Sequence, residues 1–401
     1  MKTGQIFRGD KIIWVVFLLL SIFSLVEVYS SIGLYAYSLP GTRPTGLFLK
    51  HLAIVVATYV AIIFISRINY RFFSRFAMLG YWITLVLLAV MLALQGGRWF
   101  RIPIIGQFQP SEIAKVVLII FVARMLALKK EHIAEPGVFL QLIVFIVLVV
   151  ALILPENFSM AALIFIVCYL MMYIGGVKRS YWWRLLGVLV LVGGVAMFVM
   201  LKTGDSSSAS EGGDVLHRSN IWVERIDTWL HPNDEALTQA NMSKMAIARG
   251  GVLGAGIGNT VHARLMTQAH NDFIYAIIIE ETGMMGGIIV FLLYSILYFR
   301  CVRLAWRCKG RFGALTVAGL GTVIYLQALI NMCVAVGVLP VTGQTLPFIS
   351  YGGTAYLFMG CGLGIIQSVA ADVYGKQQTV SQVEPSSIQK EEEQQEYESN
   401  H

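Results

Sequence analysis

The sequence has 401 residues, of which 57% are hydrophobic and 13% are charged, and its mean hydropathy is strongly positive. Soluble domains average about 25% charged residues, so this composition excludes an ordinary soluble domain and indicates a polytopic membrane protein. The formal net charge of +7 does not indicate nucleic-acid binding, because the basic residues cluster in short loops between apolar segments. The five cysteines have no metal-ligand spacing, and we expect reduced thiols without disulfides.

The apolar segments predict an all-α fold with about ten transmembrane helices, because each is long enough to cross a hydrocarbon core of about 30 Å. They cover residues 11–31, 46–66, 77–95, 111–128, 137–155, 158–176, 182–202, 272–299, 313–338 and 353–373. Pro155, Glu156 and Asn157 join the fifth and sixth spans, which predicts a tight hairpin. No small-residue cleavage site follows the first span, so we expect it to remain as an anchor.

Basic residues predict the orientation of these spans. Lysines and arginines cluster before span 1 and after spans 2, 4, 6 and 8, whereas the alternate short loops hold few or none. The positive-inside rule then makes both termini cytoplasmic and places the large loop 203–271, between spans 7 and 8, outside the membrane. We expect residues 1–373 to form one transmembrane domain and the Gln/Glu/Ser-rich residues 374–401 to be a disordered cytoplasmic tail.

The large outer loop has three parts. Residues 204–213 are rich in serine and glycine and should be mobile. The stretch IWVERIDTWLHP has the spacing of an interfacial helix. The stretch SKMAIARGGVLGAGIGNT predicts a small-residue helix that runs into a glycine-rich turn, and no strand precedes its glycines, so we reject a nucleotide-binding loop.

The stretch QAHNDFIYAIIIEETGMMGG carries three acidic side chains into an apolar span. Asp272 is expected at the membrane boundary, where a substrate can reach it. A continuous helix would place Glu280 roughly 12 Å deeper than Asp272, and it would place Glu281 on nearly the opposite side of the helix from Asp272. Buried carboxylates in a span face a protein interior, a partner or a water-filled cavity. Each glutamate therefore has two open interpretations, a functional one and a structural one in which it ties helices together.

A second polar stretch, GGRWFRIPIIGQFQPSEIAK, leads into an apolar span. Pro110 can open a helix, which places Glu112 in the first turn and Lys115 one turn later. A helix N-terminus with Lys115 inside, and with Arg98 and Arg101 nearby, is typical of an anion site. The alternative is an intrahelical Glu112–Lys115 pair with arginines that reach the interface, and the motif favours neither.

A third polar stretch, NMCVAVGVLPVTGQTLPFISYGG, runs from Asn331 to Gly353 and breaks what would otherwise be a continuous helix. Non-helical backbone inside a membrane is tolerated only against protein or a water-lined cavity. We therefore expect a re-entrant loop or cavity wall that contains Pro340, Thr342, Gly343, Thr345, Pro347 and Ser350. All three stretches fall on the outer side of the predicted topology, where any activated sugar donor would have to be lipid-linked.

These motifs resemble the SEDS family (shape, elongation, division and sporulation; FtsW, RodA and SpoVE) over roughly residues 12–373. The resemblance implies a multi-pass protein of the bacterial inner membrane that polymerises lipid II into peptidoglycan glycan strands on the outer face. The expected partners are a class B penicillin-binding protein transpeptidase, other division proteins and membrane lipid. LPFISYGG is more similar to the division branch, FtsW, which implies a septal location, than to the elongation branch, RodA.

The resemblance also implies roles for individual residues. The catalytic aspartate of the family falls on Asp272, which we expect to act as a general base. The substrate-binding segment of the family falls on Gln109, Pro110, Ser111, Glu112 and Lys115, and its Arg-Trp pair falls on Arg98 and Trp99. From the polar stretches themselves we add further expected substrate-binding residues, which are Arg101, Glu280, Asn331, Pro340, Thr342 and Ser350. A divalent cation (Mg²⁺ or Mn²⁺) could help to neutralise the pyrophosphate, held by Glu112 or Glu280.

Two positions depart from the family pattern. Gln107 stands where a basic residue is common, and Asn157 stands where an aspartate is common, so no role of those residues is carried over. Three alternatives to a division polymerase remain open: an elongation-branch polymerase, a lipid II flippase, and a non-enzymatic division scaffold.

Overall fold

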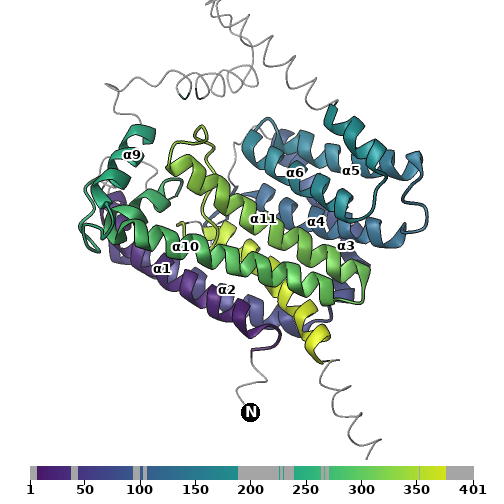
Figure 1. Ribbon diagram of the computed structural model, residues 1–401, viewed down its shortest axis with the longest axis horizontal. Coiled ribbons are helices and arrows are strands. Elements are labelled where there is room, and N and C mark those ends of the chain that lie inside the picture. The colour runs from purple at the N-terminus through teal and green to yellow at the C-terminus, as the bar shows by residue number, and fades with distance from the viewer. Residues whose placement is uncertain are drawn as a thin grey trace, which may run out of the picture.

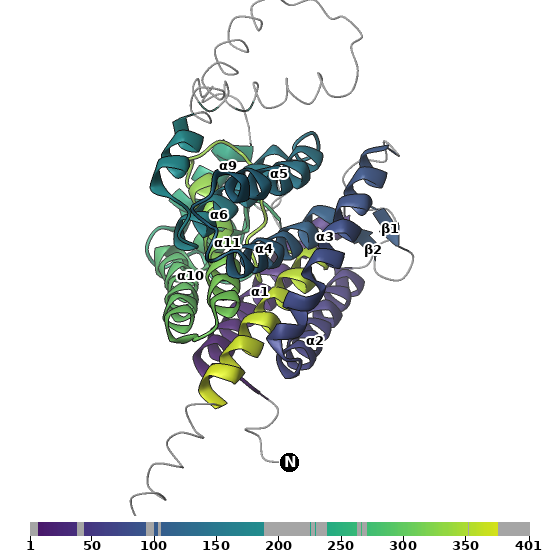
Figure 2. The same cartoon turned by 90° about the vertical axis from the view of Figure 1, so that its right-hand side faces the viewer.

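The computed structural model describes residues 7–37, 44–93, 100–102, 106–187, 225, 229, 239–262, 266, 271–351 and 353–375. Within these ranges the regular secondary structure is helical apart from one short hairpin (Figures 1 and 2). The helices are α1 (Lys11–Tyr37), α2 (Pro44–Arg67), α3 (Tyr70–Ala93), α4 (Pro110–Leu128), α5 (Pro136–Ile153), α6 (Phe158–Ile174), α9 (Gln239–Gly250), α10 (Ile274–Arg307), α11 (Arg311–Ala335) and a final helix, Gly353–Gly375, drawn in yellow.

Seven of the described helices are long and apolar enough to cross a membrane, namely α1, α2, α3, α5, α10, α11 and the final helix. Two further predicted spans coincide with α4 and α6. Helix α4 carries Glu112, Lys115 and Arg124, and α6 is an apolar helix of 17 residues. Of the predicted span 182–202, only residues 182–187 are described, and these are helical. The prediction of a multi-pass helical protein is confirmed, whereas the count of ten and the orientation stay predictions.

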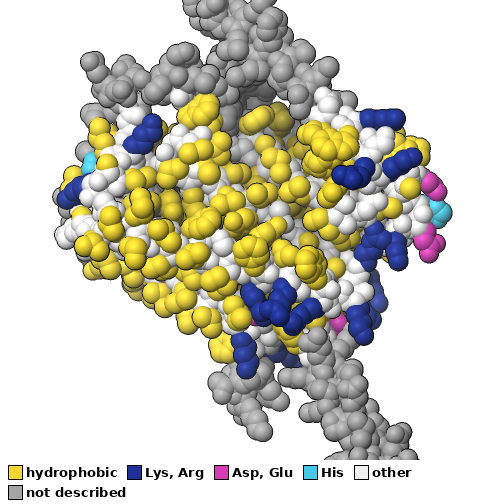
Figure 3. Space-filling model, viewed as in Figure 1, with side chains coloured by type: hydrophobic (Ala, Val, Ile, Leu, Met, Phe, Trp, Pro, Cys, Tyr) yellow, Lys and Arg dark blue, Asp and Glu magenta, His cyan; other side chains and the backbone are white. Residues whose placement is uncertain are grey.

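The surface of the helical bundle is apolar across its broad middle. Figure 3 shows hydrophobic side chains over most of this face, with lysine and arginine side chains gathered mainly toward its lower and right-hand margins. On α2, for example, Leu49, Val60 and Phe64 are each more than half exposed. Exposed apolar side chains over such an area fit a protein that is surrounded by lipid.

Helix boundaries extend beyond the apolar segments, most of all at the start of α3 and at the end of α10. Helix α3 begins at Tyr70 instead of near residue 77, so Arg71 lies within the helix. Helix α10 continues to Arg307, through Arg300. Hydropathy identifies only the part of a helix that contacts lipid. The helical hydrogen bonds continue beyond that part into the membrane–water interface, where long basic side chains are tolerated.

Two connections position the polar motifs. The predicted tight turn between the fifth and sixth spans is confirmed, and the Asn157 side chain accepts a hydrogen bond from the Met160 amide at 3.1 Å as the N-cap of α6. The stretch before α4, predicted as a loop, contains an antiparallel hairpin of β1 (Phe100–Ile102) and β2 (Gly106–Phe108). Sequence analysis missed this hairpin because each strand has only three residues.

The two ends of the described chain meet at one end of the bundle. Asp10, before α1, forms an ion pair with Arg300 of α10 and accepts a hydrogen bond from Tyr374 of the final helix at 2.8 Å. The Asp10 amide donates to Gln367 of the final helix at 2.7 Å. Within the bundle, α10 packs against α1, α9 and α11, and α4 packs against α3 and α11 (Figure 1).

Candidate active site

Asp272 lies in the turn that precedes α10, because the helix begins at Ile274. The helical spacing predicted between this aspartate and the two glutamates is therefore wrong. Two side chains hold the turn by its backbone. Asn331 Nδ2 donates to the carbonyl of Asp272 at 2.8 Å, and Ser350 Oγ donates to the carbonyl of Asn271 at 2.7 Å. The Asp272 side chain is partly exposed, so it lies at a surface that another molecule can reach.

The segment between α11 and the final helix is non-helical over residues 336–351, as predicted. It passes close to the catalytic candidate, since a Cβ added at Gly343 would lie 3.7 Å from Asp272 Oδ2. The Asn331 amide that binds the Asp272 turn also donates to the carbonyl of Gln344 at 2.7 Å. One amide therefore joins the irregular segment to the turn.

The Glu112–Lys115 pair reaches the same segment. Lys115 is fully buried, and its Nζ donates to Glu112 Oε2 at 2.8 Å and to Gln327 Oε1 at 2.7 Å. Gln327 Nε2 donates to the carbonyl of Thr345 at 3.0 Å. Glu112, Gln327, Thr345 and Ser350 also line one small pocket. The intrahelical pair expected as one alternative is present, but it is buried beside the segment that contacts the Asp272 turn.

Buried polar atoms without a hydrogen-bond partner among the described residues gather around these elements. They are Ser111 Oγ, Ser159 Oγ, Asn331 Oδ1, Thr342 Oγ1 and Gln344 Oε1. Gln344 Nε2 lies 3.5 Å from Asn157 Oδ1, so α6 approaches the irregular segment as well. Because a buried polar atom without a partner is costly, such a group of atoms indicates a place that receives a polar ligand.

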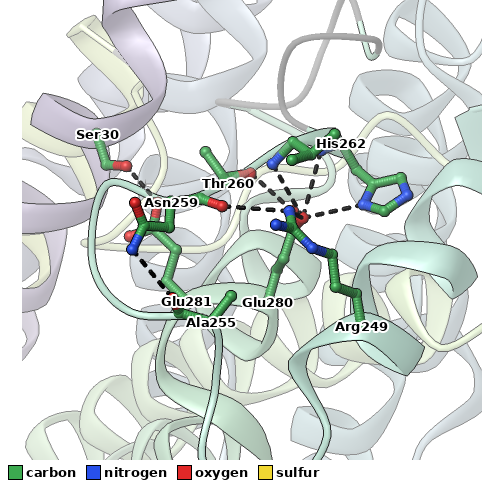
Figure 4. A network of polar contacts seen from close by, with 9 residues as sticks. Ser30, Arg249, Ala255, Asn259, Thr260, His262, Glu280 and Glu281 are labelled. Carbon is green, nitrogen blue, oxygen red and sulfur yellow. Dashed lines mark hydrogen bonds and ion pairs between the residues drawn. The ribbon is translucent and has the colours of Figure 1, made fainter.

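Glu280 belongs to a separate network (Figure 4). Its carboxylate is fully buried and receives hydrogen bonds from Arg249 Nη1 at 2.8 Å, Thr260 Oγ1 at 2.7 Å and the Val261 amide at 3.0 Å. His262 Nδ1 lies 2.9 Å from the same carboxylate. These contacts favour the structural interpretation, in which Glu280 fastens the residues after α9 to α10.

The glycine-rich turn after α9 packs directly on a break in α10. Gly283 has φ 75° and is non-helical, which leaves neighbouring backbone groups without partners in the helix. The amides of Ala255 and Gly256 donate to the carbonyls of Glu280 at 2.8 Å and Glu281 at 2.9 Å. A Cβ at Gly254 would lie only 2.2 Å from the Glu281 carbonyl oxygen. The predicted turn is therefore confirmed, and its glycines allow two backbones to touch.

The expected divalent cation does not fit the described carboxylates. Glu112 is paired with Lys115, and Glu280 is paired with Arg249, so the two acids lie in different networks and each already faces a cationic side chain. The described residues contain no group of three or more metal-ligating side chains. We therefore derive no chemical step through a metal ion.

Several other predicted site residues can now be located. Gln109 is buried at the N-cap of α4, and Pro340 and Thr342 are partly buried in the irregular segment. Arg98 and Trp99 lie outside the described residues, and Arg101 lies in β1. Most of the stretch IWVERIDTWLHP, predicted as an interfacial helix, also lies outside the described residues.

Sequence analysis missed two glutamines. Gln327 binds the irregular segment, and Gln344 belongs to that segment and lies close to Asn157. Gln327 had a usable signal, because it lies in an apolar span four residues before Asn331 and therefore on the same helix face. The partners of Glu280 had no such signal, since Arg249, Thr260 and His262 meet it only through the path of the glycine-rich turn.

Comparison with known proteins decides the family. The model of the FtsW/RodA/SpoVE family, described as "Cell cycle protein", matches residues 10–375. The chain belongs to this family. The resemblance found in the sequence motifs is thereby confirmed over nearly the whole described bundle.

Relatives with similar sequences span almost the full chain. A protein of Geobacter metallireducens named probable peptidoglycan glycosyltransferase FtsW is 29% identical over 388 residues, which cover 94% of this chain and 98% of the relative. A Bacillus subtilis protein with the same name is 27% identical over 361 residues, with 87% of each chain covered.

Solved structures confirm the fold. A chain of a peptidoglycan synthase complex that coordinates polymerization and crosslinking matches with a TM-score of 0.68 at 24% identity, covering 91% of this chain and 98% of that one. The rod shape determining protein RodA of Thermus thermophilus matches with a TM-score of 0.63 at 21% identity and the same coverage.

Proposed function

We propose that this protein is a peptidoglycan glycosyltransferase that polymerises lipid II, with Asp272 as the general base. The observation that carries the proposal is the junction of three polar motifs: the irregular segment 336–351 contacts the Asp272 turn through Ser350 and the buried Lys115 through Gln327. The names of the relatives, which are probable peptidoglycan glycosyltransferases, support the same activity.

In this mechanism Asp272 takes the proton from the 4-hydroxyl of the acceptor sugar as that oxygen attacks the anomeric carbon of the lipid-linked donor. The bond to the pyrophosphate breaks, and a single displacement inverts the donor configuration. Lys115 has three N–H groups and, among the described residues, uses two of them on Glu112 and Gln327, which would leave the third for a phosphate oxygen. Electrostatic stabilisation of the leaving group is strongest in such a buried position.

The polar atoms around the junction fit the rest of the substrate. Sugar hydroxyls and acetamido groups both donate and accept hydrogen bonds. They could therefore pair with the Thr342 hydroxyl and the side-chain oxygen of Gln344, Oε1. Arg98, Trp99 and Arg101 would add contacts to the pyrophosphate from the connection before α4. Glu280 is better explained as a structural tie than as a substrate ligand.

The topology that this function requires has ten spans, both termini in the cytoplasm and the three motifs on the outer face. The meeting of Asp10, Arg300 and Tyr374 supports two ends on one side. The protein would work in the bacterial inner membrane with a class B penicillin-binding protein, which the likeness to a chain of a peptidoglycan synthase complex supports. The FtsW name of the relatives favours the division septum.

Polymerisation of purified lipid II by the purified protein with its partner tests the general base. Because general-base catalysis contributes about 10²–10⁴-fold, Asp272→Asn should lower the rate by a comparable factor. The substitution preserves the backbone carbonyl that Asn331 binds, so the unfolding midpoint should stay unchanged. A normal rate for folded Asp272→Asn would exclude the proposed role.

A flippase is the main competing function. It predicts that labelled lipid II crosses liposome membranes at a rate that depends on this protein, with or without polymer formation. Translocation that is abolished in Asp272→Asn, in the absence of any polymerisation by the native protein, would favour transport over glycosyl transfer.

A further inference from the structure

A strained turn lies behind the Asp272 turn. Phe348 has φ 63°, which makes it the one non-glycine residue with positive φ in the described part of the chain. Left-handed backbone is unfavourable for a bulky residue and persists only where the surroundings hold it. The Phe348 ring is buried and packs edge-on against Phe17 of α1, with ring centroids 5.2 Å apart.

Hydrogen bonds fasten the strained turn on both sides of Phe348. Tyr294 of α10 donates its hydroxyl to the carbonyl of Pro347, and Ser24 of α1 donates to the carbonyl of Ile349 at 2.9 Å. Ser350 accepts from the Leu346 amide at 2.7 Å and donates to the carbonyl of Asn271. The turn therefore transmits the positions of α1 and α10 to the residue beside Asp272.

Ser24 differs from Ser21 and Ser31 on the same helix. Ser21 and Ser31 donate to the carbonyls four residues earlier, Phe17 and Glu27, which is a common arrangement for serine in a helix. The Ser24 hydroxyl instead reaches across to Ile349. Some other contact must direct it away from its own helix.

His51 of α2 supplies that contact. Its Nε2 lies 2.8 Å from Ser24 Oγ, and the single hydroxyl hydrogen of Ser24 is already used on Ile349. Ser24 must therefore accept from His51, which places a proton on Nε2. His51 is fully buried, and its Nδ1 has no hydrogen-bond partner among the described residues, so one N–H donor is its sole polar contribution there.

We propose that His51 is a positioning residue for the reaction. It directs the Ser24 hydroxyl to Ile349, which holds the strained turn, and Ser350 of that turn holds Asn271 next to Asp272. This inference rests on the proposed function of Asp272. In this proposal His51 does not touch the substrate. It acts through Ser24 and the turn, and its ring also lies beside that of Tyr351, with centroids 5.5 Å apart.

The test compares two substitutions of His51 in the full-length protein with its partner. His51→Gln keeps an N–H donor near the position of Nε2, whereas His51→Leu keeps the bulk and removes the donor. The control is Thr58→Val on the same helix, because Thr58 is fully buried and its hydroxyl bonds only to Ile54 of α2 among the described contacts. The two measurements are kcat and KM for lipid II polymerisation and hydrogen exchange of the peptides covering 346–351 and 271–277.

His51→Leu should lower kcat about tenfold with little change in KM, since misplacement of a catalytic group reduces the rate of the chemical step. It should also raise hydrogen exchange in both peptides about tenfold, because local opening becomes easier. His51→Gln should restore most of both values, and Thr58→Val should resemble the native protein.

The failures of the two proposals are distinguishable. Unchanged exchange in His51→Leu, or a His51→Gln variant as impaired as His51→Leu, would overturn the role of His51 while polymerisation by the native protein continues. Absence of polymerisation by the native protein would instead overturn the proposed function.

Discussion

Glu280 and Glu281 are adjacent in α10, yet their surroundings have little in common. Glu280 faces Arg249, Thr260 and the residues after α9, and its carboxylate is surrounded by donors (Figure 4). Glu281 faces α1, where Ser30 donates to it, and it also receives a backbone hydrogen bond from Gly258. Consecutive helix residues point about 100° apart, so two neighbours can serve two interfaces. The first glutamate holds a loop in place, and the second approaches another acid.

The break in α10 at Gly283 closely follows the two glutamates and packs against the turn after α9. Disturbing this contact should give the largest loss of stability. Gly254→Ala would place a Cβ 2.2 Å from the Glu281 carbonyl oxygen, against backbone that cannot rotate away. Its φ of 83° adds further strain. We expect a loss of about 4 kcal/mol or more in the free energy of unfolding, measured by denaturation in detergent, since a steric conflict with rigid backbone is one of the few mechanisms that reach that range.

A matched control separates the contact from the backbone strain. Gly258 has a similar φ of 84°, but a Cβ there meets nothing within 4 Å among the described residues. Gly258→Ala should therefore lose only about 1–2 kcal/mol. Equal losses for the two variants would show that the contact between the turn and α10 contributes little.

Glu280→Gln comes next in size. The amide nitrogen of glutamine would face donors such as Arg249 and His262, and the charge that pairs with Arg249 would be lost. Removing one partner of a buried ion pair costs about 3–5 kcal/mol, and the partial exposure of Arg249 places the expected loss near the lower value. Glu281→Gln should cost less than about 1 kcal/mol, because its amide oxygen can still accept from Ser30. Comparable losses in thermal unfolding would erase the distinction between the two glutamates.

These differences also mark the limit of sequence analysis. Hydropathy predicted the spans, and the irregular segment followed from Pro340 and Pro347, because helix cannot continue through such a stretch. The break at Gly283 was not predicted, since a glycine in an apolar helix is usually tolerated and its φ of 75° depends on contact with Gly254. Local sequence signals carry no information about contacts between backbone segments that lie far apart in the sequence.

The site shows the same division. The sequence motifs identified Asp272, Glu112 and Lys115, and the structure connects them through Gln327 and Asn331. The assignment of Glu280 to substrate binding relied on its position in an apolar helix, which does not distinguish a ligand from a structural tie. That distinction depends on Arg249, whose approach is determined by the fold.

Glu27 gives a small expected effect, and its sign is opposite. It is fully buried on α1, three residues before Ser30 and on the same helix face, and it interacts electrostatically with Glu281. Neither of its carboxylate oxygens has a hydrogen-bond partner among the described residues. Because a buried charge without a partner costs more than a buried neutral amide, Glu27→Gln should raise the stability by about 1 kcal/mol, measured as a higher unfolding midpoint in detergent.

The pair can be isolated by combining substitutions. If Glu27 and Glu281 repel each other, Glu27→Gln removes the repulsion, and a second change, Glu281→Gln, should then bring no further gain. Ser30→Ala serves as the control, since it removes the donor to Glu281 and leaves both acids, so the midpoint should fall. A lower midpoint for Glu27→Gln would mean that Glu27 stabilises the contact between α1 and α10. The different surroundings of Glu280 and Glu281 would then not correspond to opposite effects on stability.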